Sequence, residues 1–180
     1  LGRMTAMANN SLLHSNSFDG ALPTELGRMT AMANNFLLHS NSFDGALPTE
    51  FGRMTAMESH FLLYGNEFRG SLPTQLGQCT SLTSALRLHQ NKFTSTIPTQ
   101  LGSLTKMTST NHLYSNNLCG AIPSEVAALS SQVSGWDITT DNDLGTPCCE
   151  TLPVSYTCAP SPLPTPAPTT PLPTPQPTSL

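Results

Sequence analysis

The side chains best suited to chemistry are histidines and tyrosines that recur at one position of a 25-residue period. Around them, hydrophobic and polar residues alternate as in a β-strand, whose successive side chains point to opposite faces. If the copies stack, equivalent positions form rows across a parallel sheet whose strands lie about 4.8 Å apart. We therefore expect one row of rings on the outer face of that sheet: His14, His39, Tyr64, His89 and Tyr114.

Two further rows are predicted on the same outer face. One row holds Asn10, Asn35, His60, Ala85 and Thr110, and the other holds Leu12, Leu37, Leu62, Arg87 and His112. Tyr and Arg are frequent anchors of binding interfaces, and an exposed leucine stripe is unusual unless a partner covers it. The ligand-binding residues predicted from these rows are His14, His39, His60, Leu62, Tyr64, Arg87, His89, His112 and Tyr114.

No carboxylate falls on these rows, which bears on enzymatic activity. Glycoside hydrolysis needs a pair of Asp or Glu side chains, and a Ser-His-Asp triad needs an acid beside its histidine. The acids Asp19, Asp44 and Glu67 instead fall on the expected turns. We therefore expect no enzymatic activity, no cofactor and no metal site, since His14 and His39 have no third ligand near them.

The histidines suggest an acidic partner. With Arg87 and five histidines, the face is expected to become more positive below about pH 6.5. The hypothesis is that it binds an anionic polysaccharide or an acidic protein patch more tightly in mild acid. The alternative is that His14 and His39 match only because the first two copies are recent duplicates.

The repeat itself predicts how these rows are positioned. Residues 1–25 and 26–50 differ only where Ser11 is replaced by Phe36, and three more divergent copies follow to residue 125. Apolar residues at fixed places in each copy can form a core only when the copies stack. An asparagine in each copy would bond backbone groups of its own and the adjacent coil: Asn16, Asn41, Asn66, Asn91 and Asn116. A glycine column suits a turn, is interrupted by Ser95, and is followed by a proline that opens a short helical turn.

These motifs carry a family resemblance. Leu76-Gly77-x-x-Thr80-x-Leu82, then Leu86-x-Leu88-x-x-Asn91-x-Phe93 and Ile97-Pro98, resembles the plant-type leucine-rich repeat. The PTELG segments are also similar to those of algal and diatom proteins. The resemblance implies a right-handed α/β solenoid with a parallel concave sheet and short 3-10 or helical turns on the convex side. Two departures bear on the strand register: one residue more than the usual unit, and Ser11 and Asn111 where the family prefers Leu.

Three regions are expected: five repeats over 1–125, a degenerate last repeat with a cysteine-containing cap over 126–158, and a Pro/Thr-rich stalk over 159–180. Cys79 falls in the buried apolar column and is expected to be an inert thiol. Two disulfides are expected among four cysteines, with Cys119 bonded to Cys148 or Cys149; free thiols are the alternative. The four are Cys119, Cys148, Cys149 and Cys158.

Composition narrows the function class. A net charge of −4 argues against nucleic-acid binding, and no apolar run is long enough for a transmembrane helix. Because the chain starts at Leu1, we expect a fragment, with a membrane anchor or a catalytic domain conceivable outside it. By resemblance, the chain is expected to be an extracellular or cell-surface recognition module of a receptor-like or secreted protein, binding a protein or a wall polysaccharide. The alternatives are a structural wall or matrix protein, a secreted enzyme inhibitor, or an ice-binding solenoid presenting its threonine columns.

Overall fold

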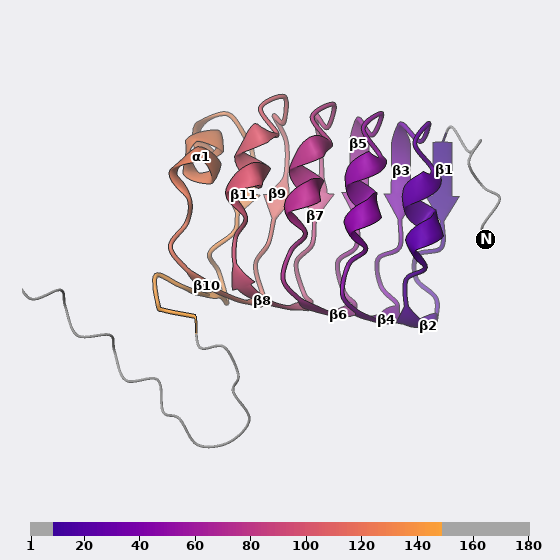
Figure 1. Cartoon of the computed structure of the whole chain (residues 1–180), viewed down its shortest axis with the longest axis horizontal. Coiled ribbons are helices and arrows are strands. Elements are labelled where there is room, and N and C mark those ends of the chain that lie inside the picture. The colour runs from indigo at the N-terminus through magenta and orange to yellow at the C-terminus, as the bar shows by residue number, and fades with distance from the viewer. Residues whose placement is uncertain (1–8, 149–180) are drawn as a thin grey trace, which may run out of the picture.

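The computed structural model describes residues 9–148, which form a solenoid of stacked coils. Each coil contributes one strand to a six-stranded parallel sheet, the first sheet (Figure 1). Equivalent residues pair along it, as Phe36 does with Phe61, so the predicted register is confirmed. Its strands, in order across the sheet, are β1 (Asn9–Leu12), β3 (Asn34–Leu37), β5 (Ser59–Leu62), β7 (Leu86–Arg87), β9 (Asn111–His112) and β11 (Trp136–Asp137).

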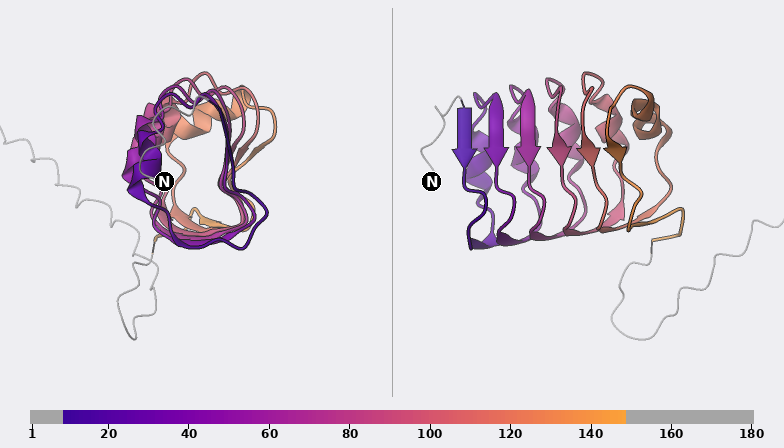
Figure 2. Two further views of the ribbon diagram at one scale, coloured as in Figure 1. Left: turned by 90° about the vertical axis from the view of Figure 1, so that its right-hand side faces the viewer. Right: turned by 180° about the vertical axis from the view of Figure 1, so that it is seen from behind.

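A second parallel sheet lies on another side of the coils, where only turns were expected (Figure 2). The chain is extended after the asparagine that recurs in each coil, and stacking places this extended segment beside the equivalent segment of the next coil. Backbone N–H and C=O groups there are paired with those of the neighbouring coil, as backbone groups in folded proteins generally must be. The strands are β2 (Asp19–Ala21), β4 (Ser42–Gly45), β6 (Glu67–Gly70), β8 (Lys92–Thr96), β10 (Asn117–Gly120) and β12 (Asp143–Leu144).

Short helical turns form the remaining side. Each follows a proline as predicted, except Ala128–Ser131, which follows Ala127. They approach so closely that a Cβ at Gly77 would collide with the Gln100 carbonyl oxygen, which explains the glycine in this column. No helix in the described part of the chain is long and apolar enough to cross a membrane. The turns are η1 (Thr24–Arg28), η2 (Thr49–Arg53), η3 (Thr74–Gln78), η4 (Thr99–Ser103), α1 (Ser124–Ala127) and η5 (Ala128–Ser131).

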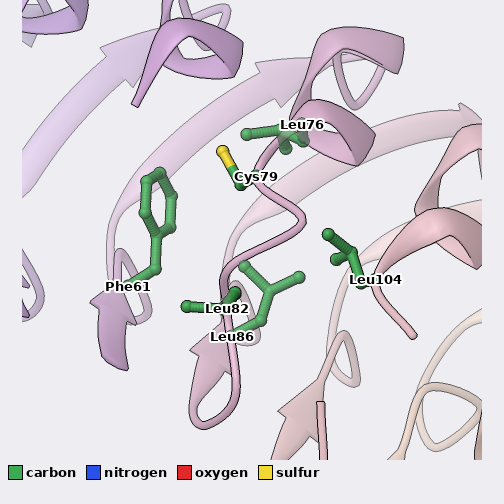
Figure 3. A pocket seen from close by; sticks show the side chains of 6 residues that line it. All are labelled: Phe61, Leu76, Cys79, Leu82, Leu86 and Leu104. Carbon is green, nitrogen blue, oxygen red and sulfur yellow. The ribbon is translucent and has the colours of Figure 1, made fainter. Parts of the chain in front are cut away.

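The interior consists of the predicted apolar columns. Phenylalanine rings stack from coil to coil, with 6.2 Å between the centroids of Phe68 and Phe93. Cys79 lies in this core as a free thiol beside a small apolar cavity (Figure 3). Burial raises the pKa of the Cys79 thiol to about 11, which makes it inert as expected.

The asparagine column forms the predicted ladder. The Asn91 side chain donates to the Leu88 carbonyl of its own coil and to the Leu63 carbonyl of the coil before, both at 3.1 Å. Its Oδ1 accepts from the Phe68 backbone N–H at 3.2 Å. Asn41, Asn66 and Asn116 repeat this arrangement.

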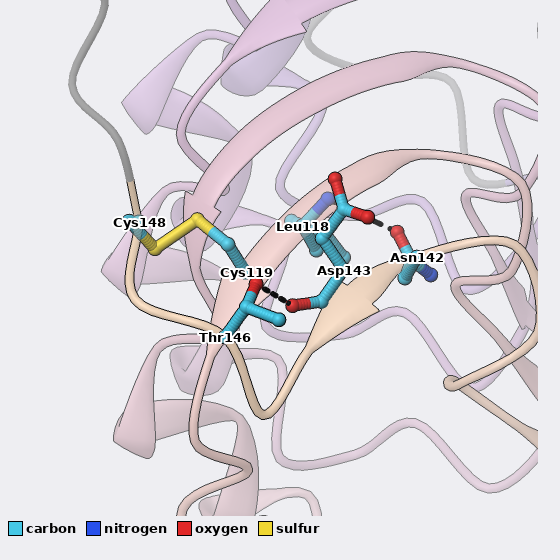
Figure 4. The surroundings of a disulfide bond; sticks show 6 residues. All are labelled: Leu118, Cys119, Asn142, Asp143, Thr146 and Cys148. Atoms are coloured by element: carbon cyan, nitrogen blue, oxygen red, sulfur yellow. Dashed lines mark hydrogen bonds between the residues drawn. A yellow bond between two sulfur atoms is a disulfide. The ribbon is translucent and has the colours of Figure 1, made fainter. Parts of the chain in front are cut away.

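A sixth coil follows the five repeats and is tied by a disulfide. Asn142 continues the ladder by accepting from the Leu118 N–H at 3.0 Å, which confirms that the frame slips by one residue here. Cys119 bonds to Cys148, one of the two predicted pairings (Figure 4). Cys149, Cys158 and the expected stalk over 159–180 lie outside the described residues.

Candidate functional site

The outer surface of the first sheet carries the predicted row of rings as a continuous stack. We call the stack of His14, His39, Tyr64, His89 and Tyr114 the ring ladder. Its successive ring centroids are 4.4–4.6 Å apart, close to the spacing of neighbouring strands. The sheet register therefore sets the stacking distance, and the ladder spans five coils.

Stacking determines which part of each ring a ligand can reach. The nearly parallel rings, 7° apart for Tyr64 and His89, cover one another's faces. The solvent side then presents ring edges, which carry the positive end of the aromatic quadrupole. On the histidines at the N-terminal end, Nδ1 lies 3.2 Å from a serine hydroxyl, Ser15 for His14 and Ser40 for His39. The ladder therefore offers a row of edges to hydrogen-bond or attract an electron-rich ligand.

His89 differs from the expectation of an accessible contact residue. Its side chain is only 6% exposed, because Tyr64 and Tyr114 stack on its two faces and His112 lies 5.3 Å away at its edge. Its Nδ1 is buried without a hydrogen-bond partner. Burial, then the nearby His112 and Arg87, lower the pKa of His89 to about 4, although Asp137 opposes the shift. His89 is therefore a buried ring within the ladder rather than an exposed anchor.

Two other predicted contact residues are also placed differently. Leu62 is 8% exposed, so the expected apolar stripe is largely closed at this point; it pairs with Leu37 on one side and Arg87 on the other. His60 has a φ of 56° and is skipped in the pairing of β5, where Ser59 and Phe61 are the paired residues. This left-handed residue accommodates the additional residue of the repeat, and it leaves His60 exposed and outside the ladder.

A charged cluster adjoins the ladder at the C-terminal half of the sheet. Arg87, His112 and Asp137 are neighbours along one row of β7, β9 and β11. The expectation of no carboxylate on this face is therefore wrong, because the sixth coil adds a strand that the five-repeat count omitted. The apolar alternation at Trp136 and Ile138, together with the ladder asparagine Asn142, is the sequence signal that locates Asp137.

Asp137 does not form a catalytic pair with His112. Its Oδ1 instead accepts from the Thr140 backbone N–H at 3.2 Å. Arg87 also has no acidic partner: the ion pairs within residues 9–148 join Arg69 to Asp44 and Lys92 to Glu67, all on the second sheet. The Nε of Arg87 is buried without a hydrogen bond. Arg87 is thus the permanent cation of this surface.

The pKa values of three histidines on this surface are lowered: His39, His89 and His112. Burial is the main cause that lowers the pKa of His39 and His112, and Arg87 adds to both shifts. His14 also lowers the pKa of His39, whereas Asp137 and a hydrogen bond to the Gly135 backbone oppose the shift at His112. These two rings and His89 therefore become charged at lower pH than an ordinary histidine, which corrects the expected charging below about pH 6.5. No group of three or more potential metal ligands occurs in the described residues.

Comparison with known proteins relates this geometry to solved structures. No family model and no curated protein matches the sequence. The LRR ectodomain of the plant membrane receptor kinase GASSHO1/SCHENGEN3 from Arabidopsis thaliana, solved with CASPARIAN STRIP INTEGRITY FACTOR 2, is similar with a TM-score of 0.72 and 35% identity. The match covers 79% of this chain and 16% of that one, so this chain spans a small part of that ectodomain.

Two other solved structures extend the comparison. The BIR3–SERK2 complex from Arabidopsis thaliana gives a TM-score of 0.60 and 31% identity over 73% of this chain and 66% of that one. A plant ice-binding protein gives a TM-score of 0.62 and 25% identity over 73% of this chain and 41% of that one.

Proposed function

This chain has the plant-type leucine-rich repeat fold of plant receptor ectodomains, and we propose that it is a non-catalytic extracellular recognition module that binds its ligand on the ring-ladder surface. The observation that carries the proposal is the ladder itself. Five rings form a continuous stack with Arg87 beside them, and all of these side chains except the buried His89 are partly exposed.

The similar proteins support a binding role. GASSHO1/SCHENGEN3 was solved in complex with CASPARIAN STRIP INTEGRITY FACTOR 2, and the similar plant peptide hormone receptor RGFR1 was solved in complex with RGF2. The Cys119–Cys148 disulfide is consistent with an extracellular location, because disulfides persist mainly in oxidising compartments.

The chemistry of the surface favours an electron-rich or acidic partner, protein or polysaccharide. Ring edges and the unpaired Arg87 guanidinium both attract negative charge. The lowered pKa values of His39, His89 and His112 mean that these rings add positive charge only in acid. We therefore expect an acidic partner to bind more tightly as the pH falls well below the usual histidine range.

The test is a binding screen of the full chain against secreted proteins and wall polysaccharides. A ligand of the ladder surface should lose at least about 1–2 kcal/mol of binding free energy in the double variant Tyr64→Ala, Arg87→Ala. Arg69→Ala is the matched control, because it removes the same charge from the second sheet. Equal losses in both variants, or none in the first, would place the ligand elsewhere. Affinity unchanged between about pH 7 and pH 4 would refute the preference for an acidic partner.

A second candidate is ice binding, favoured by two exposed columns of threonine beside the helical turns and by the similarity to a plant ice-binding protein. Regularly spaced threonines suit a flat, ordered water surface. The test is inhibition of ice recrystallisation by the full chain, with Thr49→Lys and Thr74→Lys as disrupting changes. Loss of inhibition in these variants would support ice binding, and absence of inhibition in the parent would eliminate it. The columns are Thr24, Thr49, Thr74 and Thr99, and Thr30, Thr55, Thr80 and Thr105.

A further inference from the structure

A half-open cavity of about 300 Å³, with both polar and apolar atoms in its wall, lies at the C-terminal end of the second sheet, on a different sheet from the ring ladder. Its volume is at the lower end of the range for small-molecule sites. Three neighbouring strands and the loop after them surround it, through Thr94, Ser95, Asn117, Asp143, Thr146 and Pro147. The Cys119 disulfide forms part of the same wall (Figure 4).

Three polar side chains of this cavity have no partner within the described chain, unlike the charged side chains of the preceding coils. On the earlier strands, charged side chains pair across the sheet, Arg69 with Asp44 and Lys92 with Glu67. The pairing ends at Lys92. Beyond it, Thr94, Asn117 and Asp143 make no side-chain hydrogen bond or ion pair with another described residue. A hydroxyl, an amide and a carboxylate thus border one space, where they are exposed and open to a ligand that replaces solvent.

The wall of the cavity is held in place without a ligand. The Thr146 hydroxyl donates to the Asp143 carbonyl at 2.5 Å, and the Gly120 N–H donates to the Thr146 carbonyl at 2.6 Å. The Gly145 N–H donates back to the Gly120 carbonyl at 2.8 Å, and Cys148 is bonded to Cys119 just beyond. A wall ordered in advance lowers the entropy that binding would otherwise lose.

We propose that this cavity binds a neutral, hydroxyl-rich ligand, a single carbohydrate residue or a polyol of similar size. A carboxylate accepts from hydroxyl groups, an amide both donates and accepts, and a threonine hydroxyl does either. No cationic side chain lines the cavity, so an anion would meet the Asp143 charge uncompensated. The cavity also has a single carboxylate, whereas tight calcium sites use several, so its side chains do not favour a calcium ion. This site is separate from the ligand surface proposed above and does not depend on it.

The test is nuclear magnetic resonance of the isotope-labelled full chain, titrated with the methyl glycosides of glucose, galactose, xylose and arabinose. We expect at least one of them to shift the amide signals of residues 94–96, 117–120 and 143–146, with millimolar affinity. Asp143→Asn and Thr94→Val are near-isosteric changes at exposed positions and should each weaken binding about tenfold. Asp19→Asn, an exposed acid at the opposite end of the same sheet, is the matched control and should leave binding unchanged.

Four outcomes would overturn the proposal. They are no shifts with any glycoside, shifts confined to the ring-ladder surface, equal affinity in the parent and in both cavity variants, and shifts of these amides with calcium chloride but not with the glycosides. Amide shifts on the ring-ladder surface would test the function proposed above and not the cavity. The two proposals can therefore fail independently.

Discussion

Removing a central ladder asparagine should destabilise the solenoid far more than removing a terminal one. In Asn91→Ala, the Phe68 N–H loses its acceptor in the core. The Leu63 and Leu88 carbonyls each keep a second asparagine donor, from Asn66 and Asn116. One unsatisfied buried N–H costs about 1–3 kcal/mol, and weakened carbonyl bonding with the space left by the amide adds to it. We therefore expect a total loss of about 2–4 kcal/mol of unfolding free energy.

The matched control is Asn16→Ala, because Asn16 is exposed and bonds only the Leu13 and His14 carbonyls of its own coil. Its loss should stay below about 1 kcal/mol. Urea unfolding of the full chain gives both free energies. Hydrogen exchange of the Phe68 amide gives the local effect, which should be faster in Asn91→Ala alone. Equal losses in the two variants, or unchanged exchange at Phe68, would refute the view that the ladder works by satisfying backbone groups between coils.

Three further predictions concern strain, a buried amide and a buried titratable ring. Ser95 has a φ of 70° where other coils have glycine; Ser95→Gly should raise the unfolding free energy by about 1 kcal/mol, measured by urea unfolding, with no gain if the turn is unstrained. Asn111 is buried with its Oδ1 unpaired, so Asn111→Leu should gain about 1–3 kcal/mol in the same assay, and a loss would indicate an unseen partner. The pKa of His89 falls from its unfolded value to about 4 on folding, so the unfolded chain takes up the proton first. Stability is then complete above about pH 6.5 and falls by up to about 3 kcal/mol towards pH 4. The His89→Phe variant keeps a ring in the stack, and its unfolding free energy should decrease with falling pH by that much less. Identical pH profiles of unfolding free energy in the parent and the variant would contradict the burial of a neutral His89.

Much of the fold could be predicted because each repeat places the same residue type at the same position of its coil. Phe68, Asn91 and Pro98 each represent a column whose chemistry has one place in a stacked coil: the core, the inter-coil ladder and the start of a helical turn. The second sheet could not be predicted in this way. Its strands carry few apolar residues besides the phenylalanine column, and they exist because stacking places equal segments side by side.

The site shows the same division. The sequence alone determined that His14, His39, Tyr64, His89 and Tyr114 share one row, because parallel in-register strands align equivalent positions. Only the tertiary structure decided how each member is exposed.

Stacking of rings from three coils buries His89. The left-handed backbone at His60 keeps its side chain out of the ring ladder. The sixth coil adds Asp137 to the outer face of the first sheet. The tertiary structure also decided that Asp143 lines a cavity rather than forming an ion pair. Periodicity specifies which residues are neighbours along a row, whereas burial, pKa and free hydrogen-bonding groups depend on side chains from several coils at once.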